Sequence, residues 1–131
     1  MEYTYQIIPE HKLVIEQVTG EVTVQELAYK TQTVFSDPLY VPTYNGVMDL
    51  RHAVSRMSKV ELYGFASLIS ESEMFGQSKW AILANDPIVV ALSHIFKHRL
   101  PDQTTLGIFC TIQAAAEFVG HPEVLNYLKD E

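Results

Sequence analysis

Three polar side chains follow one short apolar run and have the chemistry to bind or to react. Asp49, Arg51 and His52 come at the end of the run Val47–Leu50. Such a run predicts a buried central strand that ends there. Ligands of open α/β sheets bind where strands end, so these residues are candidates for a binding or switch site. A structural ion pair beside a solvated loop would account for the same residues and is the favoured alternative.

No catalytic set follows from these residue types. The order of the chain assembles no serine–histidine–acid set, and no side chain is singled out as a nucleophile. We therefore expect a protein that is not an enzyme and that uses no cofactor. Catalysis by Asp49, Arg51 or His52 remains the weakest of three functional hypotheses.

Ser58 is a fourth candidate, and it also has a structural role. Ser58 and Glu61 have the spacing of a capping box, in which each side chain bonds a free backbone N–H at a helix start. The cap alone is worth about 1 kcal/mol. A phosphate at Ser58 is the sharper alternative, because a helix start favours negative charge and nearby basic residues would pair with it.

The histidines and the cysteine point to no metal site. His94 and His98 lie four residues apart on a predicted helix, a spacing that can hold a metal, but a third ligand is missing. We expect no metal. Cys110, the sole cysteine, ends an apolar strand and is expected to be a buried thiol.

Apolar side chains gather around the second and third predicted helices. Core packing is their default role. If part of the group is exposed, it would form a homodimer interface, and if it lines a cavity, it would hold a small apolar ligand. The group comprises Met57, Tyr63, Phe65, Met74, Phe75 and Phe96.

Composition narrows the partners. The 131 residues are 47% hydrophobic and 19% charged, which is the balance of one globular domain over residues 1–131. The net charge of -7 argues against nucleic acid and anionic membranes as partners, because both bind basic surfaces. No apolar run reaches about 18 residues, so we expect no membrane insertion. One cysteine and a start without a signal-peptide pattern indicate a cytoplasmic protein.

The remaining pattern predicts the elements that position these residues. The predicted order is ββαβαβαβα with a short C-terminal helix, which implies a single α/β domain with a mixed, mostly parallel sheet. Gly64, inside the second helix, suggests a close neighbour. The predicted strands are Tyr3–Ile8, Lys12–Val18 (ended by Gly20), Gly46–Leu50, Lys79–Asn85 and Thr104–Cys110, and the helices start at Thr23, Ser58, Asp86, Thr111 and Pro122.

This order resembles the SpoIIAA-like branch of the STAS superfamily, small bacterial proteins also labelled STAS/SEC14-like. The resemblance covers nearly the whole chain and rests on the hairpin, on Asp49-Leu50-Arg51, on the run Trp80–Ala84 and on Thr105–Phe118. It implies a STAS fold and a regulatory, protein-interaction role like that of anti-sigma-factor antagonists.

In those antagonists a partner kinase phosphorylates a serine at the start of the second helix. That position falls on Ser58 here, but Met57 precedes it where aspartate is expected, and Lys59-Val60 follows in place of a small residue and glycine. We therefore expect, first, an interaction domain with an unknown protein partner and, second, a binder of a small apolar ligand near the second and third helices. An exposed apolar patch without a cavity would favour the first, and a closed cavity lined by Phe65 or Phe96 the second.

Overall fold

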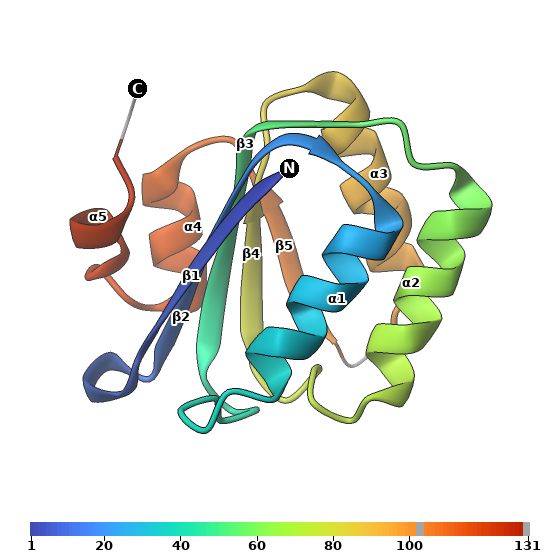
Figure 1. Ribbon diagram of the computed structural model, residues 1–131. Helices are drawn as coiled ribbons and strands as arrows, with labels where there is room; N and C mark the ends of the chain where they lie inside the picture. Colours follow the sequence, from blue (N-terminus) through green and yellow to red (C-terminus); the bar gives the residue numbers. More distant parts are fainter. Residues whose placement is uncertain (102–103, 130–131) are drawn as a thin grey trace.

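The centre of the molecule is a five-stranded sheet in which the strands lie in chain order, β1-β2-β3-β4-β5 (Figure 1). The computed structural model describes residues 1–101 and 104–129. β1 pairs with β2 in antiparallel fashion, and the other three pairs are parallel. The strands are β1 (Glu2–Ile8), β2 (Leu13–Val22), β3 (Asn45–Ser55), β4 (Lys79–Leu83) and β5 (Thr105–Phe109).

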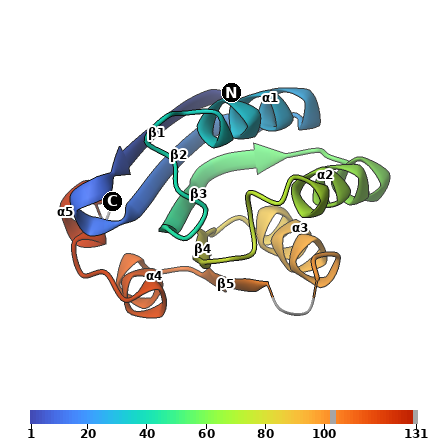
Figure 2. The same ribbon diagram turned by 90° about the horizontal axis from the view of Figure 1, so that it is seen from below.

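Helices cover both faces of the sheet, but unequally. Because the strand order never reverses, the three right-handed crossovers place three helices on one face. The helix after β5 and the last short helix cover the other face (Figure 2). The first group is α1 (Val24–Phe35), α2 (Lys59–Glu71) and α3 (Pro87–His98), and the second is α4 (Ile112–Val119) and α5 (Val124–Tyr127). The α/β class and the element order expected from the sequence are confirmed.

Alternation along β2 separates two apolar cores. Val14 and Val18 pack under α1–α3, whereas Leu13 and Ile15 pack under α4 and α5. Glu16 lies between the two valines and faces the α1–α3 side, as its place in the alternation predicts. β2 does not stop at Gly20, because the chain continues extended to Val22.

β3 is twice as long as predicted. It continues through Arg51 and His52 to Ser55, so these residues lie within the strand rather than at its exit. The register against β2 shifts because Gln17 pairs with Asp49 but Thr19 pairs with His52, which leaves one extra residue in β3. A bulge of this kind bends a strand and re-aims the side chains beyond it.

Gly46 lets one aromatic side chain cross the sheet. Trp80 on β4 pairs with Gly46 on β3, and a Cβ at position 46 would lie only 2.4 Å from Cη2 of the indole. The indole therefore lies flat over β3 in space that only glycine leaves open. Gly64 is different: a Cβ there would meet nothing within 4 Å, so the close neighbour expected at Gly64 is absent.

Helix starts follow the predicted caps. Thr23, Ser58, Asp86 and Thr111 each accept a hydrogen bond from a backbone N–H of the first turn. The prediction for Cys110 is wrong: β5 ends at Phe109, and the thiol lies exposed in the turn before α4. Among the described residues no helix has the length and apolarity needed to cross a membrane.

Candidate ligand-binding pocket

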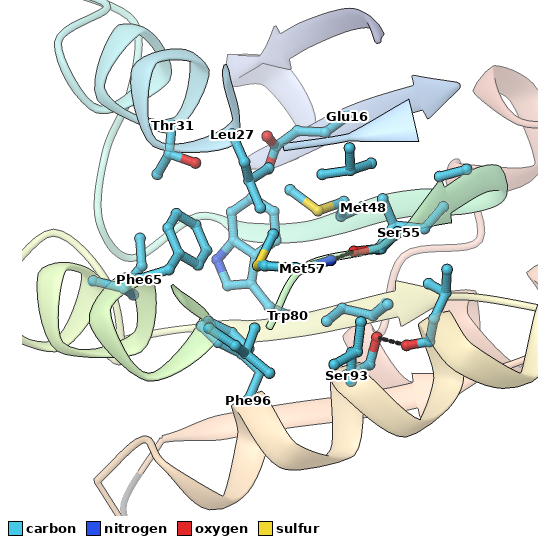
Figure 3. Close-up of a pocket in the computed structure, with 18 of the residues that line it drawn as sticks. Glu16, Leu27, Thr31, Met48, Ser55, Met57, Phe65, Trp80, Ser93 and Phe96 are labelled. Carbon is cyan, nitrogen blue, oxygen red and sulfur yellow. Dashed lines mark hydrogen bonds between the residues drawn. The ribbon is translucent and has the colours of Figure 1, made fainter. Parts of the chain in front are cut away.

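An apolar pocket lies between the sheet and helices α1–α3, and we call it the interlayer pocket. Its volume is about 120 Å³. Figure 3 shows side chains from both layers pointing into it. The strands contribute Glu16, Met48, Ala53 and Trp80, and the helices contribute Leu27, Thr31, Phe65, Ser93 and Phe96.

The bulge in β3 helps to shape this pocket. Before the bulge, Met48 and Leu50 point into the pocket, whereas Asp49 lies on the opposite face. Beyond it, the odd-numbered residues Ala53 and Ser55 line the pocket instead. The extra residue therefore changes which side chains of β3 face the pocket, from even-numbered residues before the bulge to odd-numbered residues after it.

The apolar residues singled out in the sequence divide into two groups. Met57, Phe65, Phe75 and Phe96 line the pocket, and the rings of Phe65 and Phe96 stack with centroids 5.6 Å apart. Tyr63 is not among the lining residues.

Tyr63 and Met74 lie outside the interlayer pocket. The guanidinium of Arg99 sits 4.1 Å from the centroid of the Tyr63 ring, a cation–π contact on the α2–α3 surface. Met74 packs against the rim of the core, and its carbonyl accepts a 2.7 Å hydrogen bond from the Tyr40 hydroxyl.

Among the described residues that line the pocket, Glu16 is the one with a carboxyl group, and it was not among the site candidates expected from the sequence. It is 4% exposed, and its Oε2 accepts a hydrogen bond from the Tyr3 hydroxyl. Burial raises the pKa of Glu16 to about 8, so the carboxyl is mostly protonated at neutral pH. Burial, and then the charge of Glu16, raise the pKa of Tyr40. The sequence did contain a signal for this site. Glu16 alternates with Val14 and Val18 along one strand, which places a carboxyl group on the side of the strand that faces the core.

Trp80 contributes a second polar group. The side chain is 5% exposed, and within the described chain its Nε1–H has no hydrogen-bond acceptor. Figure 3 shows this nitrogen on the edge of the indole that faces Phe65. Buried N–H groups without an acceptor are uncommon, since each loses its bond to water on folding.

Asp49 and Arg51 form a structural pair on the opposite face of the sheet. Nε and Nη2 of Arg51 donate to the two carboxylate oxygens of Asp49, both at 2.9 Å. Nη2 also donates to the carbonyl of Lys129 at 3.0 Å. The Arg51 side chain is 8% exposed and the Asp49 side chain 4% exposed. Through the bond to Lys129, the pair attaches the C-terminal segment to β3. Neither residue lines the interlayer pocket.

The other polar candidates do not converge on the pocket either. His52 is exposed on β3. Ser58 is exposed and forms the complete capping box with Glu61, with bonds of 3.1 and 3.0 Å. His94 and His98 are exposed on α3, and the described residues contain no group of three side chains suited to a metal ion.

The strand order explains why the site lies between layers. In α/β sheets a crevice opens at the strand ends where the order of strands reverses. This sheet has no reversal, so its strand ends form no such crevice. Comparison with protein-family models finds no match, and comparison with curated proteins finds none either.

Proposed function

We propose that this protein binds a small apolar molecule in the interlayer pocket and performs no catalysis. The observation that carries the proposal is an apolar pocket of about 120 Å³ lined by Phe65 and Phe96. Protein interiors contain few voids larger than a water molecule. A pocket lined mostly by apolar side chains with a few polar groups is the usual form of a small-molecule site, and a bound apolar ligand would remove its walls from water.

The proposal includes membership of the SpoIIAA-like branch of the STAS superfamily. It is supported by the order ββαβαβαβα, the N-terminal hairpin and the Asp49–Arg51 pair on the central strand. The second half of the label STAS/SEC14-like is consistent with an apolar ligand.

Regulation through a protein partner or a second copy of the chain is the second candidate. It is favoured by exposed apolar side chains on α1 and α2, with Tyr29 70% and Val60 78% exposed. Native mass spectrometry separates the two candidates, because a retained small molecule adds mass to one chain whereas self-association doubles the mass. It also reports any phosphate on Ser58.

Benzene is a direct probe of the pocket. An engineered apolar cavity of about 150 Å³ in another protein binds benzene, so a cavity of similar size here should bind it as well. We expect benzene to shift the methyl NMR signals of Leu27 and Met48 and to raise the unfolding temperature. Ser93→Leu should abolish these effects, because the new side chain fills the pocket.

Ser70→Leu is the matched control for Ser93→Leu. Ser70 is exposed on α2, and its hydroxyl donates to Ala66 O, just as the Ser93 hydroxyl donates to Val89 O. The control should bind benzene like the parent protein. Equal binding by both variants would place benzene elsewhere and contradict the proposal.

A further inference from the structure

The polar groups of the interlayer pocket restrict the class of ligand, and this inference rests on the proposed function. The described residues that line the pocket include no arginine, lysine or histidine. A carboxylate or phosphate ligand would therefore enter an apolar site without a cation to pair with, which is costly. The net charge of -7 adds long-range repulsion of anions.

The first recognition group is the indole of Trp80. Its six-membered ring lies over Gly46, and Gly46 pairs with Val14 of β2. The indole thus reaches from β4 across β3 toward β2. Its Nε1–H is buried without an acceptor, so an acceptor atom on a ligand would satisfy a donor that the protein leaves unpaired.

The second group, Glu16, is adjacent to the first. It is the next residue after Val14 on the same face of β2, and therefore lies beside the row that the indole crosses. Its Oε2 accepts a hydrogen bond from the Tyr3 hydroxyl. Because the carboxyl holds its proton at neutral pH, it is a neutral donor.

We propose that the interlayer pocket selects an uncharged, ring-sized organic molecule with a hydrogen-bond acceptor, such as a cyclic ketone, which the Trp80 indole N–H and the Glu16 carboxyl recognise. The indole N–H and the protonated carboxyl are neutral donors, and such donors in an apolar pocket suit a carbonyl or ether oxygen. A hydrocarbon would leave both donors unpaired, and an anion would lack a counter-charge. The volume of about 120 Å³ suits a single six-membered ring.

Three ligands of the same ring size test this selection: cyclohexane, cyclohexanone and cyclohexanecarboxylate. The chain has one tryptophan, so one indole N–H signal in a ¹H–¹⁵N spectrum reports on Trp80 alone. These ligands are not aromatic, so ring currents do not obscure the signal. At pH 6.5 we expect cyclohexanone to bind about fivefold more tightly than cyclohexane, as one added hydrogen bond allows, and to move the indole proton downfield. Cyclohexanecarboxylate should not bind.

Two variants assign the effect to the two donors. Trp80→Phe keeps an aromatic ring and removes the N–H, so cyclohexanone should lose most of its advantage over cyclohexane. Glu16→Gln keeps an uncharged donor, so the preference for the ketone should persist and extend above pH 8. The ligand series with the unaltered protein tests the proposal even if Trp80→Phe fails to fold.

The outcomes separate this inference from the proposed function. If cyclohexane and cyclohexanone bind equally, the pocket binds apolar molecules but does not distinguish those that carry a hydrogen-bond acceptor. The face of the Phe65 ring would then be the partner of the indole N–H, and the inference is overturned. Tightest binding of cyclohexanecarboxylate would overturn it as well. If neither these ligands nor benzene binds, the proposed function itself fails.

Discussion

Glu16 shows how one buried carboxyl group makes the stability of a fold depend on pH. A carboxyl buried among Val14, Val18 and Met48 retains its proton, because ionisation there would strand a charge in an apolar pocket. The Tyr3 hydroxyl is its hydrogen-bond partner, and Tyr40 is the other titratable group that senses its charge. Such a residue weakens the fold at alkaline pH, and a ligand-recognition role would give a reason to retain it.

The titration of Glu16 predicts a falling stability between about pH 4.5 and pH 8. The unfolded chain loses this proton near the ordinary pKa of 4.5, whereas the folded protein keeps it until about pH 8. The folded state therefore binds more protons than the unfolded chain across this window. As the pH rises through it, the free energy of unfolding falls by up to about 1.4 kcal/mol per pH unit. Glu16→Gln should remove this fall. Urea denaturation from pH 5 to pH 9 measures it.

Glu21→Gln is the control for this titration, because Glu21 is an exposed carboxyl on the same strand. The variant should follow the pH profile of the unaltered protein. Parallel profiles for Glu16→Gln and the unaltered protein would show that Glu16 ionises at its ordinary pKa and is hydrated.

Helix α2 shows which elements follow from local sequence. Its start at Ser58 was readable because a capping box depends on residues three positions apart. The length of β3 was not readable, because the charged residues after Leu50 resemble a strand exit. Arg51 remains within the strand because Asp49 and the Lys129 carbonyl satisfy it, and Lys129 is distant in sequence.

Two substitutions in α2 should change stability in opposite directions. Ser58→Ala removes the cap and should lower the free energy of unfolding by about 1 kcal/mol. Gly64→Ala should raise it by about 0.5–1 kcal/mol, since a Cβ there meets nothing within 4 Å. Ser58→Asp should be close to neutral because aspartate also caps helices. Guanidinium denaturation measures all three.

Ser67→Ala distinguishes the cap from a general effect of losing a serine. Ser67 is exposed inside α2, where alanine is the better helix former, so this variant should be neutral or slightly stabilised. If Ser67→Ala lowered the free energy of unfolding as much as Ser58→Ala does, the capping role of Ser58 would be contradicted.

At the scale of the molecule, the sheet separates the face that carries the interlayer pocket from a structural face. The Asp49–Arg51 pair belongs to the structural face, where it holds the segment after α5. Arg51→Met leaves the buried Asp49 carboxylate without its counter-charge, although the backbone N–H of residue 51 still donates to it, so we expect the free energy of unfolding to fall by about 3–5 kcal/mol. Hydrogen exchange at α5 should accelerate more than exchange at α2.

Arg56→Met is the matched control, because Arg56 also pairs with a carboxylate but is 88% exposed. Its effect should stay below about 1 kcal/mol. The double variant Asp49→Asn/Arg51→Met should recover part of the loss by removing the stranded charge. A small effect of Arg51→Met alone would show that the pair contributes little to holding the C-terminal segment.

The class of fold was predictable because each element carries its own periodicity and caps, from the hairpin to α4. The pocket was predictable only in part. The group of apolar residues around the second and third predicted helices included Phe65 and Phe96, which line the pocket. It also included Tyr63, which does not line the pocket. Trp80 was treated as a strand residue only, because its role depends on Gly46 of another strand. Contacts between strands are set by register, which the local pattern does not contain.

The chain-order sheet has a consequence for synthesis on the ribosome. Each new strand pairs with the strand made just before it, so the sheet grows at one open edge while the chain is extruded. Trp80 and the rest of β4 emerge before α3, which closes the pocket over them. Nascent chains that stop short of α3 therefore display the unfinished pocket as an apolar surface, and we expect chaperones to engage the chain at this stage rather than earlier.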